Sequence, residues 1–163
     1  MGLKFDGKCL DFIHLRWIAS FVNLAHEKTK DGFNFMTDKM PIIAVVDDSP
    51  TSISLYQFSV EPLVVDFVGF KSSAEALPYL EENQPDLLFL DIIMPGMDGL
   101  SLLKHLRTLS LHQDTPVIMV TSKDYAQDRQ VAKQLGALDF MIKPLRFKEI
   151  RNIVCKYVDV EFK

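Results

Sequence analysis

Five polar side chains, which follow four apolar runs of the sequence, have the types and spacing to form one reactive centre. They are Asp47, Asp48, Asp91, Thr121 and Lys143. Three carboxylates held close together repel one another and retain protons unless a cation neutralises them. Oxygen ligands of this kind suit Mg²⁺, which proteins usually bind through a few carboxylates together with waters. A metal ion, a hydroxyl and an ammonium describe a site for a tetrahedral dianion, with the carboxylate of Asp91 as the nucleophile.

The apolar runs before these residues predict the strands that would bring them together. The runs are Ile42–Val46, Leu87–Leu90, Val117–Val120 and Phe140–Ile142. Continuous apolar runs of this length are typical of strands that are buried on both faces in parallel sheets. The carboxyl ends of such strands lie at one edge of an open α/β sheet, where these folds bind their ligands. Each polar residue alone is common in turns, caps or loops, so the prediction depends on the joint pattern.

Helix signals alternate with the strand signals along the chain. Ser49 is the predicted N-cap of one helix, and Ser72 with Glu75 forms the capping-box pattern at the start of another. Gly136 is expected to end a later helix as a C-cap glycine. A further strand is predicted over residues 63–70. Strict alternation of strands and helices predicts an α/β fold, with a parallel sheet that carries helices on both faces.

The N-terminal residues lie apart from this pattern and predict an amphipathic helix followed by a linker. The helix carries apolar residues at helical spacing, namely Leu10, Ile13, Trp17, Phe21 and Leu24. A single helix of this kind cannot bury its apolar stripe alone. Two roles stay open, because the helix either packs on its own domain or on a second copy of the chain, or binds a partner. We therefore expect one segment over residues 1–39 and one domain over residues 40–163.

The composition is ordinary for a soluble globular protein and excludes several classes. The 163 residues, of which 48% are apolar and 25% charged, suit one domain with an extension. The net charge of −4 argues against direct binding of nucleic acid. Cys9 and Cys155 have no metal-ligand or redox spacing, and the most apolar window, Leu10–Ala25, is too short to cross a bilayer. No signal peptide is apparent, so a cytoplasmic protein is expected.

Four motifs resemble those of the receiver domains of two-component response regulators, of the stand-alone chemotaxis-regulator type. The motifs are Val45–Ser49, Leu90–Gly99, Pro116–Ser122 and Lys143–Pro144. The resemblance covers residues 41–158, and the separations between the motifs are those of the family. It implies a flavodoxin-like, doubly wound sheet with the strand order 2-1-3-4-5, in agreement with the pattern of strands and helices.

The resemblance also implies roles for the acidic residues. It makes Asp91 the phosphoacceptor, Asp48 a direct ligand of Mg²⁺ and Asp47 a ligand through water. At the position of Ile93 the family supplies a metal ligand through the backbone carbonyl, so the apolar side chain is no objection. The phosphoryl group would come from a phosphohistidine on a sensor histidine kinase or a phosphotransfer protein.

Further residues match the parts of the family that respond to the phosphoryl group. Thr121 matches the hydroxyl that moves toward it, and Lys143 matches the ammonium that binds it. Phe140 falls at an aromatic switch position that is commonly Tyr; its ring can turn inward but lacks the hydroxyl, and an ordinary core phenylalanine is the alternative. Pro144 matches a proline that the family joins through a cis peptide bond.

The expected function is a switch in two-component signalling, and not an enzyme that acts on a separate substrate. Phosphorylation would change a surface that contacts an unknown downstream protein, with a homodimer through the N-terminal helix or the face of the last helix as a further expectation. Two alternatives are a haloacid-dehalogenase-type phosphatase and an interaction module that is never phosphorylated. The first needs an acid two residues after the nucleophile, where this chain has Ile93. The presence of all the site residues argues against the second.

Overall fold

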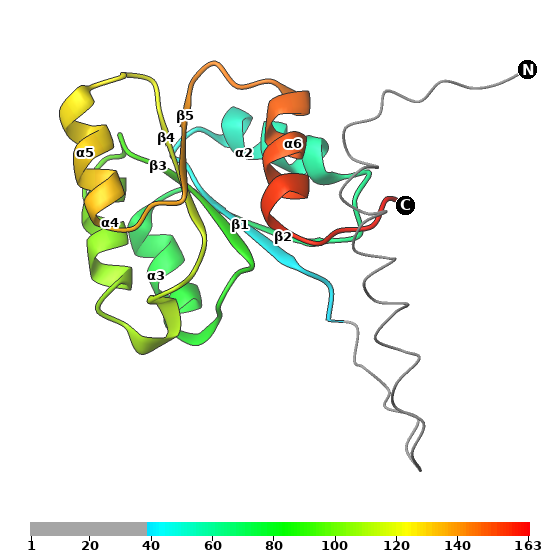
Figure 1. Cartoon of the computed structure of the whole chain (residues 1–163), viewed down its shortest axis with the longest axis horizontal. Coiled ribbons are helices and arrows are strands. Elements are labelled where there is room, and N and C mark those ends of the chain that lie inside the picture. The colour runs from blue at the N-terminus through cyan, green and yellow to red at the C-terminus, as the bar shows by residue number, and fades with distance from the viewer. Residues whose placement is uncertain (1–38) are drawn as a thin grey trace, which may run out of the picture. The chain divides into compact units, whose positions relative to one another are not determined.

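A parallel five-stranded sheet forms the centre of the domain in the computed structural model, which describes residues 39–163 (Figure 1). The strands are β1 (Ile42–Val46), β2 (Asp66–Phe70), β3 (Leu87–Asp91), β4 (Val117–Thr121) and β5 (Asp139–Ile142). Their order is β2-β1-β3-β4-β5, and every neighbouring pair is parallel. The predicted flavodoxin-like order is confirmed. The predicted N-terminal helix lies outside the described residues.

Five α-helices of the described part of the chain cover the two faces of this sheet (Figure 1). They are α2 (Pro50–Val60), α3 (Ser73–Glu82), α4 (Gly99–Leu106), α5 (Ala126–Gln134) and α6 (Phe147–Tyr157). A short 3₁₀ helix, η1 (Ser110–His112), precedes β4. Helices α2 and α6 pack on one face, and α3, α4 and α5 pack on the other. Among the described helices, none combines the length and the apolar character needed to cross a membrane.

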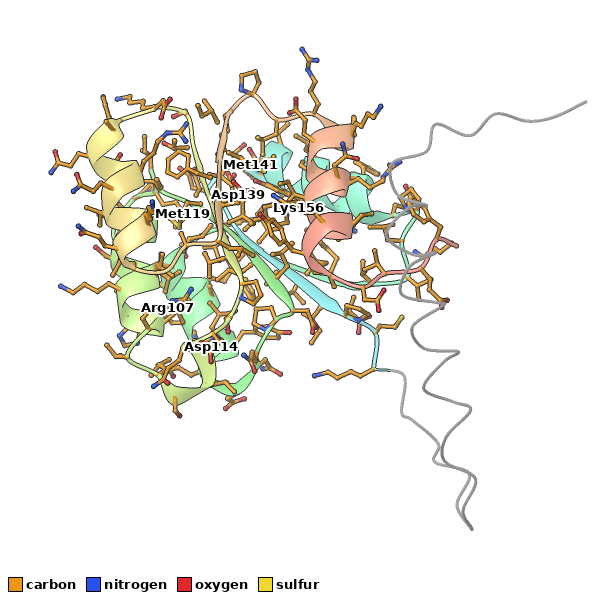
Figure 2. The ribbon with its side chains drawn as sticks, in the orientation of Figure 1. Arg107, Asp114, Met119, Asp139, Met141 and Lys156 are labelled. Atoms are coloured by element: carbon orange, nitrogen blue, oxygen red, sulfur yellow. The ribbon has the colours of Figure 1, made fainter. Side chains whose placement is uncertain are left out.

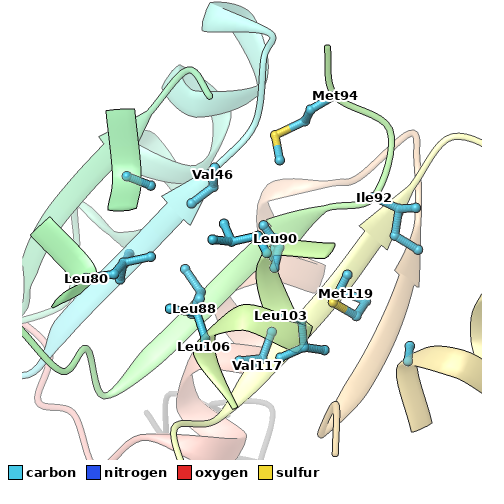
Figure 3. Packing of buried hydrophobic residues seen from close by; sticks show 14 residues of the cluster. Val46, Leu80, Leu88, Leu90, Ile92, Met94, Leu103, Leu106, Val117 and Met119 are labelled. Atoms are coloured by element: carbon cyan, nitrogen blue, oxygen red, sulfur yellow. The ribbon is translucent and has the colours of Figure 1, made fainter. Parts of the chain in front are cut away.

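Alternating side chains of the central strands supply the two halves of the hydrophobic core. Ile43 and Val45 of β1 pack on the side of α2 and α6, whereas Ala44 and Val46 pack on the side of α3 and α4. Figure 3 shows the second half, to which Leu90 of β3 also belongs. Every residue of β1, β3 and β4 is buried, as predicted for strands that are covered on both faces. The core therefore fixes the ends of these strands relative to one another.

The helix starts follow the predicted caps, with one difference at α3. Oγ of Ser49 accepts a hydrogen bond from the backbone N–H of Ser52 (3.3 Å). Oγ of Ser72 accepts one from the N–H of Glu75 (3.1 Å). The carboxylate of Glu75, however, accepts from the N–H of Lys71 (2.9 Å) and not from that of Ser72. The capping box is thus only half formed, because the extended backbone at Ser72 turns the preceding N–H toward this carboxylate.

The second strand is shorter than predicted. It begins at Asp66 and not at residue 63, and Leu63 instead forms an isolated antiparallel bridge with Phe162. The backbone N–H of Val64 donates to the carbonyl of Glu161 (2.8 Å). The C-terminal segment therefore satisfies the backbone groups before β2, and a local sequence pattern cannot predict this long-range pairing.

Gly136 terminates α5, as predicted. Its φ of +74° lies in the left-handed region, which glycine adopts without a steric penalty. Its N–H donates to the carbonyl of Lys133 (3.1 Å), and the N–H of Ala137 donates to that of Ala132 (2.9 Å). These two hydrogen bonds form a Schellman motif.

The guanidinium of Arg107, at the end of α4, joins the end of α5 to two other segments. It donates to the carbonyls of Leu135 (3.0 Å), Gly136 (3.0 Å), His112 (2.5 Å) and Thr115 (3.0 Å). Figure 2 shows Arg107 in this position between the helices and the segment that leads into β4. The planar guanidinium thus holds three chain segments together through its N–H donors. The ammonium of a lysine could not make the same set of hydrogen bonds, because its donors do not lie in one plane.

Replacing Arg107 by lysine is expected to lower the free energy of unfolding by about 2 kcal/mol, since several carbonyls lose their donor. Arg151→Lys is the matched control, because within residues 39–163 Arg151 donates a single hydrogen bond, to the carbonyl of Ser59 (3.0 Å). Urea unfolding of the two variants measures the difference. Equal losses would show that the contacts of Arg107 contribute no more than that single bond.

Candidate functional site

The carboxyl ends of four strands bring the predicted polar residues to one edge of the sheet. Asp47 and Asp48 directly follow β1, β3 ends at Asp91, and β4 ends at Thr121. Lys143 follows β5, and its backbone N–H donates to the carbonyl of Thr121 (2.8 Å). This edge is where open α/β sheets place their ligand sites. The topology therefore gathers all the candidate residues at one end of the domain.

The ammonium of Lys143 lies between two buried carboxylates. Its Nζ atom is 2.5 Å from Oδ2 of Asp91 and 2.7 Å from Oδ2 of Asp47. These aspartates are only 4% and 1% exposed, so their charges need a partner. The contact with Asp91 has hydrogen-bond geometry, whereas that with Asp47 is an ion pair of poor angle. Oδ2 of Asp47 is therefore a buried oxygen without a directed hydrogen bond from any described residue.

The three aspartates have the geometry and chemistry to hold a divalent cation. One carboxylate oxygen from each of Asp47, Asp48 and Asp91 lies within 4.8 Å of the others. Asp48 is exposed, so the cluster is open to solvent on its side. A donor set made only of oxygens, including the buried oxygen of Asp47, is the kind that Mg²⁺ prefers. The residues present therefore fit this ion.

The backbone after β3 lies beside the same cluster. The N–H of Ile93 donates to Oδ1 of Asp91 (3.2 Å), so the peptide at this position is next to the carboxylate. The side chain of Ile93 is 42% exposed. This placement agrees with the expected use of the Ile93 backbone, and its role as a metal ligand stays a prediction.

Burial and neighbouring charge shift the pKa values in this cluster. Burial raises the pKa of the Asp91 carboxyl above its ordinary 3.8, although the hydrogen bond and the charge of Lys143 oppose the shift. Burial lowers the pKa of Lys143, but the carboxylates of Asp47 and Asp91 outweigh it and raise this pKa above 10.5. The lysine therefore stays cationic at neutral pH, where it offsets two acids that water scarcely reaches.

The two predicted switch residues share one face of the sheet. Thr121 is buried, and its Oγ1 accepts a hydrogen bond from the N–H of Lys123 (3.2 Å). Phe140 is half-buried and packs against the core half beneath α3, α4 and α5. The peptide bond between Lys143 and Pro144 is cis, as the family resemblance implies. The structure thus puts Thr121 and Phe140 on one face of the sheet, and their roles as switch residues stay predictions.

Three residues support the site in ways that the sequence patterns did not predict. Tyr56 is fully buried beside Phe89, and burial, reinforced by the charges of Asp47 and Asp91, raises the pKa of its hydroxyl. Oγ of buried Ser73 donates to the carbonyl of Met97 (2.8 Å) and so ties α3 to the loop after β3. Gly99 packs directly on the backbone of Asp91. None of these contacts has a local sequence signal, because each joins separate elements.

These features define a class of protein. Its members are flavodoxin-like domains with an acidic cluster, a hydroxyl and a lysine at the carboxyl edge of the sheet. The family model described as "Response regulator receiver domain" matches residues 43–155. The chain therefore belongs to this family and contains the receiver domain of a two-component response regulator.

Two similar proteins agree with this assignment. The cyclic di-GMP phosphodiesterase response regulator RpfG of Xanthomonas campestris pv. campestris is 36% identical over 111 residues, which cover 67% of this chain and 29% of RpfG. The alkaline phosphatase synthesis transcriptional regulatory protein PhoP of Bacillus subtilis is 36% identical over 108 residues, which cover 66% of this chain and 44% of PhoP. The chain thus spans less than half the length of these two relatives.

A solved structure supports the fold. The chemotaxis response regulator CheY4 of Vibrio cholerae superposes with a TM-score of 0.68 at 23% identity. The match covers 73% of this chain and 99% of CheY4. At this identity the likeness extends to the architecture alone.

Proposed function

We propose that the chain is a phosphorylation-controlled switch in which Asp91 accepts a phosphoryl group. The donor is a phosphohistidine on a sensor histidine kinase or a phosphotransfer protein. The observation that carries the proposal is the Lys143 ammonium, 2.5 Å from Asp91 and 2.7 Å from Asp47, in a domain of the receiver family. Phosphoryl transfer depends mainly on positioning and charge neutralisation, and this arrangement supplies a carboxylate nucleophile beside a cation.

In the transfer step, a carboxylate oxygen of Asp91 forms a bond to phosphorus while the bond from phosphorus to the donor histidine breaks. The electron pair of the broken bond stays on the imidazole nitrogen, and Asp91 becomes an acyl phosphate. The ammonium of Lys143 then binds a phosphoryl oxygen in place of the carboxylate. The hydroxyl of Thr121 leaves the N–H of Lys123 and donates to a second phosphoryl oxygen.

The acidic cluster holds Mg²⁺ in this proposal, with Asp48 as a direct ligand, Asp47 as a ligand through water, and Asp91 and the carbonyl of Ile93 as further ligands. Support comes from the carboxylate oxygens within 4.8 Å of one another. When bound, the ion supplies positive charge beside the phosphoryl oxygens. Asp47 and Asp48 lie beside the acceptor Asp91, and the mutual repulsion of the three carboxylates favours a cation at this point.

The output of the switch is a changed contact with another protein. The movement of Thr121 and Lys143 shifts an existing equilibrium between two states and reshapes the face formed by α5, β5 and α6. Exposed apolar side chains on this face support its use as an interface, including Tyr125 (54% exposed) and Phe147 (50% exposed). A downstream protein or a second copy of the chain is the proposed partner, and the cytoplasm the proposed location.

The direct test is the mass of the full chain after incubation with a small acyl phosphate and Mg²⁺. The wild-type chain is expected to gain one phosphoryl group, and removal of Mg²⁺ with a chelator is expected to prevent the gain. Asp91→Asn should gain none, whereas Asp114→Asn, which changes an exposed aspartate in another segment, should behave as wild type. A wild-type chain that gains no mass would contradict the proposal and favour an unphosphorylated interaction module.

Ile93 is expected to slow the loss of the phosphoryl group by water. Its apolar side chain, 42% exposed, lies two residues after Asp91 at the rim that water must cross. Lys123, two residues after Thr121, adds a cation at the same rim. In Ile93→Asn, water should remove the phosphoryl group at least about threefold faster than in the wild-type chain, because a polar side chain can orient water.

A time course of the loss of the phosphoryl group after removal of the donor measures this rate. Met97→Asn is the matched control, since Met97 is an apolar residue of the same loop with 40% exposure. Equal rates for Ile93→Asn and the wild-type chain would contradict the prediction.

A further inference from the structure

The guanidinium of Arg129 on α5 covers the ring of Phe140 on β5. Its Cζ atom lies 4.4 Å from the ring centroid, which is a cation–π contact. Nε of Arg129 also donates to Oδ1 of Asp124 at 2.5 Å, and the two side chains are 43% and 46% exposed. Asp124 therefore orients the guanidinium over the ring. Together these contacts tie the loop before α5 and the start of α5 to the edge strand.

Any inward movement of Phe140 would break this contact. In the parallel pairing of β4 with β5, Met119 lies beside Phe140 and Thr121 lies beside Ile142. Met119 and Thr121 are two residues apart on β4, so their side chains and the ring of Phe140 lie on the same face. The ring already packs in the core half that contains Met119. A turn of the ring toward Thr121 runs along this face and takes the ring out of the position in which Arg129 covers it.

Helix α5 is weakly held at its start. Among its nine residues Ala132 alone is buried, and its N-cap residue, Tyr125, makes no side-chain capping hydrogen bond. Its end, in contrast, is fixed by the Gly136 motif and by Arg107. An element with few buried contacts moves at low free-energy cost, so the contacts at the start of α5 decide whether it stays in place.

We propose that Arg129 is a latch, which holds the ring of Phe140 in its half-buried position beneath the guanidinium, and the start of α5 against β5, in the resting state. The inference rests on the proposed phosphorylation of Asp91 and names a residue that regulates that site. In the active state the ring turns toward Thr121, the guanidinium loses its aromatic partner, and the start of α5 is released. An equilibrium shifts only through contacts that differ between its two states, and this contact belongs to the resting state alone.

The test is the rate of phosphoryl uptake by full-length Arg129→Gln from a small acyl phosphate with Mg²⁺. Removing the latch raises the population of the active state, so uptake should be about two- to fivefold faster than in the wild-type chain. Lys133→Gln is the matched control, because it removes one exposed positive charge from the same helix. A merely structural role for Arg129 gives no acceleration. A rate for Arg129→Gln at or below that of Lys133→Gln overturns the latch.

Two more measurements separate this inference from the proposed function. In a Phe140→Leu background, Arg129→Gln should no longer change the rate, and an undiminished acceleration there overturns the latch. The NMR resonances of the Phe140 ring in the resting chain should shift in Arg129→Gln and not in Lys133→Gln. A wild-type chain that gains no phosphoryl group refutes the acceptor role of Asp91. Ring resonances that stay unchanged in Arg129→Gln refute the latch alone.

Discussion

Replacing Gly99 by alanine is expected to lower the free energy of unfolding by about 3 kcal/mol and to slow phosphoryl uptake roughly tenfold or more. A Cβ atom at this position would overlap the carbonyl oxygen of Asp91. It would also lie 2.9 Å from the carbonyl carbon of Asp91 and 3.1 Å from Cα of Ile92. These are backbone atoms of the strand end, which cannot turn away as a flexible side chain can. The start of α4 must therefore shift, and the carboxylate of Asp91, the proposed acceptor, shifts with the loop.

Gly96→Ala is the control for this prediction. Gly96 has a φ of +79°, but a Cβ atom there would meet nothing within 4 Å. Its replacement should cost only about 1 kcal/mol of backbone strain and leave phosphoryl uptake near the wild-type rate. Urea unfolding and a time course of mass gain measure both effects in both variants. If both variants lost similarly little stability and uptake rate, the prediction that close packing at Gly99 matters would be wrong.

Replacing Lys143 by methionine is expected to abolish phosphoryl uptake and to destabilise the fold by about 2 kcal/mol at neutral pH. The change leaves the carboxylates of Asp47 and Asp91, only 1% and 4% exposed, without the cation between them. Breaking a fully buried ion pair costs more, about 3–5 kcal/mol. The smaller figure applies because the lysine side chain keeps 21% of its surface exposed and water screens the cluster on that side.

The loss of stability in Lys143→Met should depend on pH. Burial already raises the pKa of Asp91 above 3.8 in the folded wild-type chain, and Lys143 limits this rise. Without the lysine the folded-state pKa of Asp91 rises further. An acid with a raised folded-state pKa binds its proton more tightly when folded, so stability falls as the pH rises from 3.8 through the folded-state value. The deficit of the variant should therefore be largest near neutral pH and shrink toward about pH 4.

Urea unfolding at these two pH values measures the effect. Lys148→Met, which removes an exposed lysine of α6, should show no such deficit. The double variant Lys143→Met with Asp91→Asn should recover stability at neutral pH, because one of the two opposed carboxylates is gone. A deficit in Lys143→Met that is independent of pH would show that lost packing, and not charge, destabilises the variant.

Local patterns in the chain were sufficient to predict the central strands and the members of the acidic cluster, whereas the strand order was implied by the family resemblance. Continuous apolar runs identified β1, β3 and β4, because strands covered on both faces need apolar side chains at every position. Parallel strands end at a common edge, so Asp47, Asp91 and Lys143 had to meet there once the strands were known. Caps such as Ser49 and Gly136 were also predictable, since the groups that they satisfy lie within a few residues.

The features that had no local signal all depend on contacts between distant residues. The start of β2 is set by the bridge to Phe162, and the requirement for glycine at residue 99 comes from the backbone of Asp91. The imidazole of His112 is buried, and its Nε2–H donates to the carbonyl of Leu80 on α3. The Arg129 contact with Phe140 likewise joins α5 to β5. The fold determines which elements lie side by side, and therefore which distant residues make contact. No short stretch of sequence contains that information.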